Sequence, residues 1–202
     1  MIGVVDYRAG NAPSVLYALE RLGVPARLAS ASDLELCDRL ILPGVGAARA
    51  TLDSLRDSGL VDPLTSRIEA GTPFLGICIG LQVILDHSEE GDTAGLGLVA
   101  GDVRRFPDSV RVPQIGWNEV RFRTSHPLLE GLPTVGHFYF VNSYYAVPAE
   151  ADAVLGVTDY AGAFCSVVAS GNIAATQFHA EKSGELGLKL LANFAHWDGD
   201  SC

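Results

Sequence analysis

Basic residues are scarce in this sequence, and lysine is the scarcest of them. The 202-residue chain has 14 lysines and arginines against 24 acidic residues, and its formal net charge is −10. Only Lys182 and Lys189 are lysines. A surface that binds nucleic acid without sequence preference has to be basic, because it displaces counterions from the phosphates. We therefore expect no nucleic-acid partner.

Long apolar runs and closely paired cysteines are also missing. The longest apolar runs, such as residues 74–81, are shorter than the roughly 20 residues that a membrane-spanning helix needs, so we expect no membrane association. The four cysteines include no CxxC pair and are too sparse for a disulfide scaffold. This usage predicts no metal site and a location in a reducing cytoplasm.

The length of the chain suits one domain, which we expect to span residues 1–202. Its first half alternates short apolar runs with helical patterns, and its second half has strand-like runs with little helix. We predict an α/β fold: a mixed sheet with a parallel core, helices on both faces, and extra antiparallel strands in the second half. The expected early strands are 2–7, 39–42 and 73–77, and the later ones are 99–105, 119–122, 137–141, 153–158, 165–169 and 173–177.

Helices are expected between and after these strands. Asn11 is placed to cap a helix that ends near Gly23, and a helical region follows residue 46 and runs to about residue 70. A short helix is predicted over 79–87. Ser183 is placed to cap a final helix.

The segment Gly76-Ile77-Cys78-Ile79-Gly80 lies between an apolar run and a helical pattern. This is the spacing of a nucleophile elbow with sulfur in place of oxygen. The two glycines remove side chains that would collide at such a sharp turn, and the following helix points its N-terminus at the sulfur, which favours the thiolate. The alternative is that Cys78 is only a small buried hydrophobe, because GxCxG also occurs by chance.

A second motif, His179-Ala180-Glu181, ends the last strand-like run. On an extended chain, residues two apart face the same side, so Glu181 can orient the imidazole of His179. That imidazole can then serve Cys78 as base and as acid. A surface histidine beside a surface glutamate is the alternative, but two such motifs at strand ends favour a triad.

The tight turn Pro43-Gly44-Val45-Gly46 follows the preceding parallel strand. Acyl chemistry on a thiol creates an oxyanion that needs two backbone N–H donors. We expect one from Ile79, directly after the nucleophile, and the other from Val45 or Gly46. An ordinary tight turn is the alternative interpretation of this segment.

Taken together, these motifs resemble the class I glutamine amidotransferases, and within them the glutaminase subunits of imidazole glycerol phosphate synthases. The resemblance covers almost the whole chain. No single motif is specific to these subunits, but the complete set of motifs is. Its carriers are Asp6, Tyr7, Gly10, Asn11, Ser14, Val15, residues 43–46, 76–78, Gly80, Gln82, residues 95–98, 112–113, 116–118, 138–141, Ser143 and Tyr144.

The resemblance implies a flavodoxin-like sheet and a glutaminase mechanism. Cys78 would attack the side-chain amide of glutamine, and His179 would protonate the leaving ammonia before water hydrolyses the thioester. Gln82, Glu90 and Tyr139 match positions that hold the substrate, although Glu90 could equally be a solvated acid beside its neighbour.

The resemblance also implies a partner and excludes a cofactor. The family forms a 1:1 heterodimer with a TIM-barrel cyclase, which uses the ammonia to make imidazole glycerol phosphate and AICAR in histidine biosynthesis. We expect Asn11, Trp117 and Lys182 at that interface.

Four positions depart from the family pattern, and other functions stay open. The family usually has glycine at Arg8, histidine at Gln114 and Asn142, and proline at Ala180. Arg8, Gln114 and Asn142 lie in motifs near the pocket or the partner face, so these three departures leave open the identity of the partner and its coupling to the glutaminase. The same chemistry could supply a different synthase, or the chain could be an inactive regulatory subunit.

Overall fold

The parallel half of the sheet forms the centre of the computed structural model, which describes residues 1–8 and 11–200. Gly10 and Cys202 lie outside the described residues. The strand order is β2-β1-β3-β4-β13, with parallel pairing throughout, which is the doubly wound arrangement that we predicted. The bounds are β1 Ile2–Val5, β2 Ala26–Ala29, β3 Arg39–Leu42, β4 Phe74–Ile77 and β13 Ile173–Thr176.

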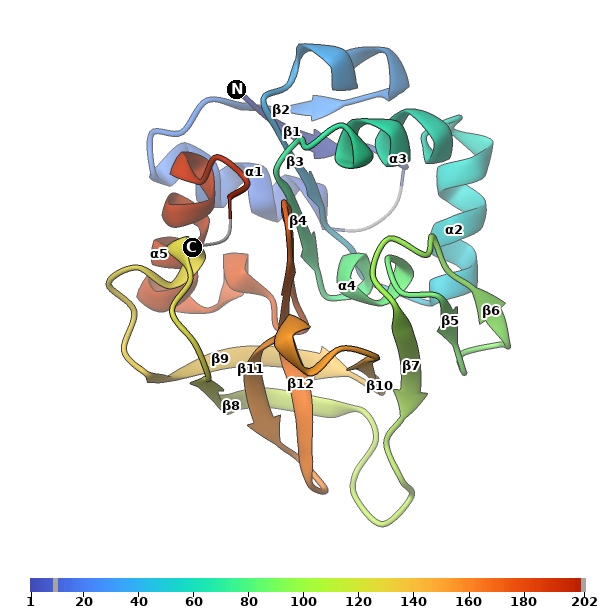
Figure 1. Ribbon diagram of the computed structural model, residues 1–202, viewed down its shortest axis with the longest axis vertical. Helices are drawn as coiled ribbons and strands as arrows, with labels where there is room; N and C mark the ends of the chain where they lie inside the picture. Colours follow the sequence, from blue (N-terminus) through green and yellow to red (C-terminus); the bar gives the residue numbers. More distant parts are fainter. Residues whose placement is uncertain (9–10, 201–202) are drawn as a thin grey trace.

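The second half of the chain extends this sheet with antiparallel strands (Figure 1). β12 pairs with β13 through a hairpin at Gly171, whose φ is +55°, and β11, β8 and β9 continue from β12 as long ribbons. The bounds are β5 His87–Ser88, β6 Thr93–Ala94, β7 Gly101–Arg105, β8 Gln114–Phe122, β9 Val135–Asn142, β10 Tyr144–Pro148, β11 Val154–Asp159 and β12 Ala163–Ser170.

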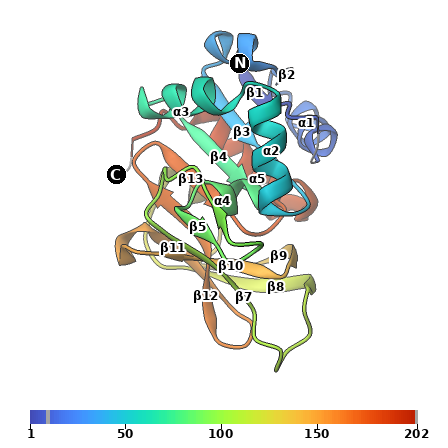
Figure 2. The ribbon, with the colours of Figure 1, turned by 90° about the vertical axis from the view of Figure 1, so that its right-hand side faces the viewer.

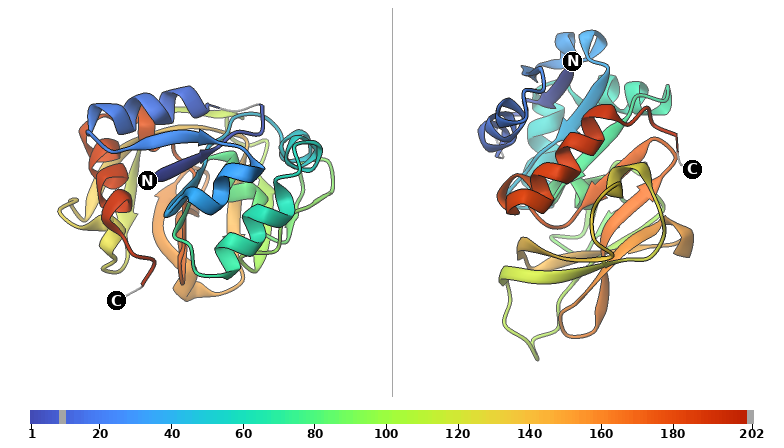
Figure 3. Two further views of the ribbon diagram at one scale, coloured as in Figure 1. Left: turned by 90° about the horizontal axis from the view of Figure 1, so that it is seen from above. Right: turned by 90° about the vertical axis from the view of Figure 1, so that its left-hand side faces the viewer.

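Helices cover both faces of the parallel strands (Figures 2 and 3). Leu42 on β3 packs in one buried cluster with residues of α2 and α3, whereas its neighbour Ile41 packs in a second cluster with residues of α1 and α5. Alternate strand residues therefore build separate cores on the two faces. The bounds are α1 Ala12–Arg21, α2 Ala48–Asp57, α3 Val61–Glu69, α4 Ile79–Val83 and α5 Gly184–His196. Within the described ranges no helix is both long and apolar enough to span a membrane.

The predicted helix over 79–87 is too long, because α4 ends at Val83 and His87 already belongs to β5. The returning segment 96–99 donates its backbone N–H groups to the carbonyls of Val83, Ile84 and Leu85. These three carbonyls therefore accept hydrogen bonds from the returning segment and not from the next turn of a helix, so α4 ends there. The segment approaches so closely that a Cβ at Gly95 would collide with the carbonyl oxygen of Leu85.

Four strands were not predicted: β2, β5, β6 and β10. β2 lies at the edge of the sheet and is only partly buried, so its sequence has no continuous apolar run. β5 and β6 have two residues each. β10 follows β9 after a single residue, Ser143, and no turn signal separates the two strands.

Candidate active site

Cys78 lies at the corner between the end of β4 and the start of α4. Its backbone has φ 55° and ψ −102°, a conformation that residues with a side chain rarely adopt. Its N–H donates to the carbonyl of Thr176 on β13 at 2.7 Å, so the neighbouring strand holds the corner in place. Strain of this kind costs on the order of 1–3 kcal/mol and is typical of functional sites.

The glycines on either side of Cys78 allow α4 to lie directly against the sheet. A Cβ at Gly76 would lie 2.7 Å from the backbone carbon and oxygen of Gly80, and a Cβ at Gly80 would collide with the carbonyl oxygen of Leu42. Both glycines are therefore required by close backbone approach, as the predicted elbow demands.

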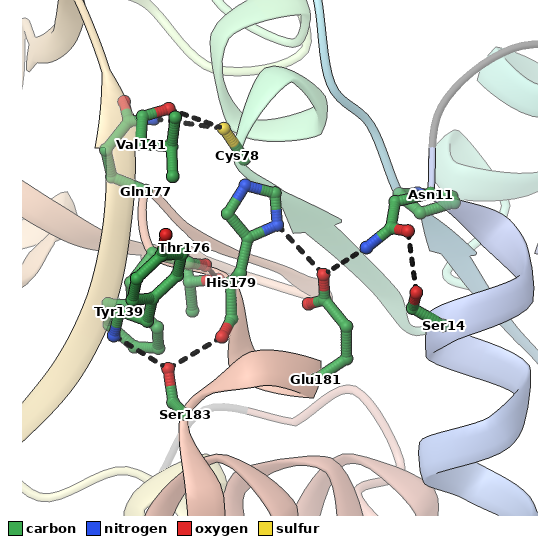
Figure 4. Close-up of polar contacts among 12 residues, drawn as sticks. Asn11, Ser14, Cys78, Tyr139, Val141, Thr176, Gln177, His179, Glu181 and Ser183 are labelled. Atoms are coloured by element: carbon green, nitrogen blue, oxygen red, sulfur yellow. Dashed lines mark hydrogen bonds and ion pairs between the residues drawn. The ribbon is translucent and has the colours of Figure 1, made fainter. Parts of the chain in front are cut away.

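The imidazole of His179 lies between the Cys78 thiol and the Glu181 carboxylate (Figure 4). Its Nδ1 is 2.9 Å from Glu181 Oε1, and the two side chains are only 2% and 0% exposed. Asn11 Nδ2 donates to the same carboxylate oxygen at 2.7 Å. A buried carboxylate with two donors is well placed to orient an imidazole.

The reason we gave for the pairing of His179 with Glu181 is wrong. Residues Ala180–Lys182 form a turn of 3-10 helix and not a continuing strand, so the turn brings the two side chains together. Ser183 stabilises this turn, because its hydroxyl donates to the His179 carbonyl at 2.6 Å.

The two predicted helix caps serve the site instead of their helices. Asn11 occupies the position before α1, but its side chain donates to Glu181 and accepts from the Ser14 hydroxyl. Ser183 precedes α5, yet its hydroxyl bridges the His179 carbonyl and the Tyr139 N–H.

The ionisation of His179 depends on its two neighbours. Burial by itself would lower the pKa of His179, but hydrogen bonds to Cys78 and Glu181, together with the charges of these groups, raise it to about 9. The imidazolium form is therefore favoured at neutral pH. An imidazolium beside a thiol is the arrangement that stabilises a thiolate.

A cavity of about 290 Å³ opens over Cys78 and His179. Its size lies near the lower end of the range for small-molecule sites. Most of the predicted site residues are brought together in its wall. These are Val45, Gly46, Cys78, Ile79, Gln82, Glu90, His179 and Lys182.

Four predicted residues do not line this cavity: Glu181, which lies behind the imidazole of His179, and Tyr139, Asn11 and Trp117. The ring of Tyr139 packs edge-on against Trp117, with ring centroids 6.1 Å apart. Tyr139 contacts the site through its backbone, since its carbonyl accepts from the His179 N–H at 2.9 Å. Strand alternation places the Tyr139 side chain on the same face of β9 as that of Val141, which lines the cavity. The expected contact of Tyr139 with substrate stays a prediction.

Gln82 and Glu90 are held by protein contacts at the cavity wall. Gln82 Nε2 donates to the Tyr144 carbonyl and to Gln177 Oε1, both at 3.1 Å. Glu90 Oε2 accepts from the N–H of Ala48, the first residue of α2, at 2.6 Å. Glu90 is thus not simply a solvated acid.

Gln177 is a site residue that the sequence reasoning missed. It is fully buried, and its Nε2 lies 3.7 Å from Cys78 Sγ. Gln177 lies two positions before His179, but the chain bends at Gln177 and Phe178, and no local pattern indicated that both side chains would meet at the same sulfur. Phe178, between them, points the other way into the core and stacks on Phe138 at 4.1 Å.

The positions that depart from the family pattern have distinct surroundings. Arg8 has φ +62°, a left-handed conformation that glycine adopts more readily. Gln114 and Asn142 are cross-strand partners on β8 and β9, and both are buried. Across residues 1–8 and 11–200, neither amide atom of Gln114 has a hydrogen-bond partner. Ala180 is fully buried.

Metal ligation has no candidate in the described part of the chain, where no three His, Cys, Asp or Glu side chains are grouped to hold an ion. The groups that the site presents are a nucleophilic thiol, a paired imidazole and backbone N–H donors.

Comparison with known proteins identifies close relatives. A family model described as glutamine amidotransferase class-I matches residues 4–197. A protein from Dehalococcoides mccartyi (strain CBDB1), named imidazole glycerol phosphate synthase subunit HisH, is 47% identical over 196 residues, which cover 96% of both chains. A protein of the same name from Geobacillus thermodenitrificans is 47% identical over 202 residues, which cover 96% of this chain and 94% of the relative.

Solved structures with lower identity share the fold. A structure described as a glutamine amidotransferase has a TM-score of 0.75 and 23% identity, and PurLQS from Thermotoga maritima has 0.76 and 18%. Each match covers 96% of this chain and 97% of the other. The predicted fold class is thus confirmed.

Proposed function

Because the chain belongs to the HisH subunits of imidazole glycerol phosphate synthase, a group of class-I glutamine amidotransferases, we propose that it hydrolyses glutamine and supplies the ammonia to a cyclase in histidine biosynthesis. The observation that carries this proposal is the strained corner at Cys78, which shares one cavity with His179 while Glu181 lies behind the imidazole.

The chemistry proceeds through a covalent thioester. The Cys78 thiolate attacks the side-chain amide carbon of glutamine, and the C–N bond breaks as His179 donates a proton to the leaving ammonia. His179 then takes a proton from water, which attacks the thioester carbonyl and releases glutamate and the thiol. Glu181 orients the imidazole and stabilises its cation in both steps.

Backbone N–H groups stabilise the oxyanion of each tetrahedral intermediate. Ile79 supplies the first donor, since it begins α4 and the first N–H groups of a helix have no intrahelical partner. Val45 or Gly46, which line the same cavity, supplies the second. Removing one such donor costs about 3 kcal/mol of transition-state stabilisation in other enzymes.

Gln82 and Glu90 recognise the amino-acid end of the substrate. Both N–H groups of Gln82 are already used within the protein, which leaves its carbonyl oxygen to accept a hydrogen bond from a ligand. The carboxylate of Glu90, fixed by Ala48, carries the charge that matches an α-ammonium. Free glutamine is thereby favoured over amides that lack this group.

The partner is a TIM-barrel cyclase that binds in a 1:1 complex over the mouth of the cavity. An exposed apolar patch, formed by Ile115, Trp117, Val141 and Val45, supports this placement. Ile115 and Trp117 are each 57% exposed, Ile115 is the cross-strand partner of Val141, and Val141 and Val45 line the cavity. Contiguous exposed apolar surface of this kind marks interaction sites. The cytoplasmic location and the single domain stay predictions.

Ammonia release from glutamine tests the proposal directly. It is measured for the wild type and Cys78→Ala, with and without a candidate cyclase and its nucleotide ligand. We expect turnover that the cyclase increases and that Cys78→Ala abolishes. A glutamine-analogue electrophile should label Cys78 and spare Cys165, a buried thiol whose pKa burial raises to about 12. If Cys78 is not labelled and no ammonia is released in the presence of the cyclase, the chain is an inactive subunit.

The partner surface is tested separately by binding. Trp117→Ala should weaken the complex about tenfold or more, as large aromatic side chains at interface centres do. Leu36→Ala is the matched control, because Leu36 is 63% exposed and ends the 3-10 helix that follows the edge strand β2. Equal affinities for the two variants would contradict the proposed patch.

A further inference from the structure

We propose that Gln177 is a positioning residue that donates an N–H to Cys78 and stabilises its thiolate, and that Gln82 and the Tyr144 carbonyl determine the direction of this donor. The inference rests on the proposed function in naming Cys78 as the nucleophile, but its chemistry concerns the thiol alone.

Two polar groups contact the sulfur, one from Gln177, directly after the parallel strand β13, and one from Val141 on the antiparallel strand β9. Gln177 Nε2 lies 3.7 Å from Cys78 Sγ, and the carbonyl oxygen of Val141 lies 3.8 Å from it (Figure 4). The carbonyl can only accept, so it favours the protonated thiol. The amide N–H can only donate, so it favours the thiolate, and a hydrogen bond to a charged atom is stronger than one to a neutral atom.

A glutamine amide could in principle turn round and present its oxygen to the sulfur. Here the orientation follows from a chain of contacts that begins at a backbone carbonyl. The Tyr144 carbonyl accepts from Gln82 Nε2 at 3.1 Å, and the same Nε2 donates to Gln177 Oε1 at 3.1 Å. A turned Gln177 would place its NH₂ group against that of Gln82, and its oxygen against the thiolate.

The backbone anchor of this chain is itself well held. The Tyr144 carbonyl also accepts from Asn142 Nδ2 at 2.9 Å, so both of its lone pairs have donors. Gln177 is 0% exposed and Gln82 is 5% exposed. Water therefore cannot easily replace a missing contact, and hydrogen bonds are stronger in such a low-dielectric interior.

Other ionisable groups also lie near the thiol, and His179 is on the same segment as Gln177, two residues later. His179 follows β13, and Glu90 and Lys182 line the same cavity. Tyr7, two residues after β1, donates to the Pro43 carbonyl at 2.9 Å, and burial raises its pKa to about 12.

The test measures how the alkylation rate of Cys78 by iodoacetamide depends on pH, in the isolated full-length chain. Peptide mass spectrometry assigns the modified cysteine. In Gln177→Met the midpoint of the profile should rise by about one pH unit or more, which corresponds to a tenfold smaller thiolate fraction at neutral pH. Gln82→Met should raise it by less, because the Gln177 amide remains but is free to turn.

Gln114→Met is the matched control, since it replaces a buried amide that has no partner in the described structure and should leave the midpoint unchanged. If Gln177→Met folds and its midpoint matches the wild type, the proposal is wrong. If Gln177→Met does not fold, Gln82→Met decides, and an unchanged midpoint there overturns the proposal equally.

Glutamine turnover separates this inference from the proposed function. A raised alkylation midpoint in a chain that never releases ammonia would refute the function and leave the role of Gln177 intact. In an active chain, Gln177→Met should lower kcat at neutral pH while KM changes little, whereas general loss of structure would reduce the folded fraction and leave the midpoint in place.

Discussion

Replacing Gly76 by alanine tests whether the close contact between β4 and α4 positions the nucleophile. The added Cβ would lie 2.7 Å from the backbone carbon and oxygen of Gly80 and 3.0 Å from the N of Leu81. Ordinary contacts of a Cβ begin at 3.4 Å, so α4 has to move away from β4 by about 0.7 Å. No flexible side chain can absorb this shift, because every atom involved belongs to the backbone.

The magnitude follows from this displacement. Overpacking in a well-packed core costs about 1–3 kcal/mol, which we expect as the loss in the free energy of unfolding. A misplacement of about 1 Å can lower an enzymatic rate about 100-fold. We therefore expect kcat for glutamine hydrolysis to fall between about 10-fold and 100-fold. Urea unfolding and ammonia release, measured on the same preparations, provide the two values.

Gly59→Ala provides the control, because Gly59 has φ +64° and open space around it. The left-handed backbone costs about 1–2 kcal/mol for alanine, so stability should fall by a similar amount while kcat stays unchanged. The reasoning is refuted if Gly76→Ala keeps wild-type turnover and stability, or if the control loses turnover to the same extent.

Three further predictions concern the surroundings of the site. The pKa of His179 is raised from the ordinary value of 6.5 to about 9, so folding stabilises its cation. This adds about 3 kcal/mol to the free energy of unfolding. The full amount is present below pH 6.5 and is lost as the pH rises to 9. Urea unfolding between pH 6 and 9 should show this loss, and Glu181→Gln should show a smaller slope; parallel slopes would contradict the assigned pKa. Asn11→Ala should lower the free energy of unfolding of the isolated chain by about 2 kcal/mol, since it removes a donor from a fully buried carboxylate. An unchanged free energy of unfolding would mean that Asn11 acts only at the partner surface. Gln114→Met should leave the free energy of unfolding unchanged or raise it by up to about 2 kcal/mol, because burying an amide with no partner in the described structure costs desolvation free energy. A clearly lower stability of this variant in calorimetry would show that the amide makes a stabilising contact.

Much of the central fold could be predicted because it follows from local pattern. Short apolar runs that alternate with amphipathic helices specify parallel strands with helices on both faces, and β1, β3, β4 and β13 lie where the pattern predicts them. The length of α4 could not be predicted in this way. Its apolar periodicity continues to Leu85, but the helix ends at Val83 because a distant segment takes its carbonyls.

The sequence by itself determined which residues carry the chemistry, because a cysteine between two glycines and a histidine two positions before a glutamate can be recognised from residue type and spacing alone. Only the tertiary structure decided how they are supported. Asn11 and Ser183 look like helix caps, yet they hold Glu181 and His179, and Gln177 contacts a sulfur 99 positions away. The direction of a side chain depends on the donors and acceptors that folding brings to it, and these come from segments that no local pattern relates.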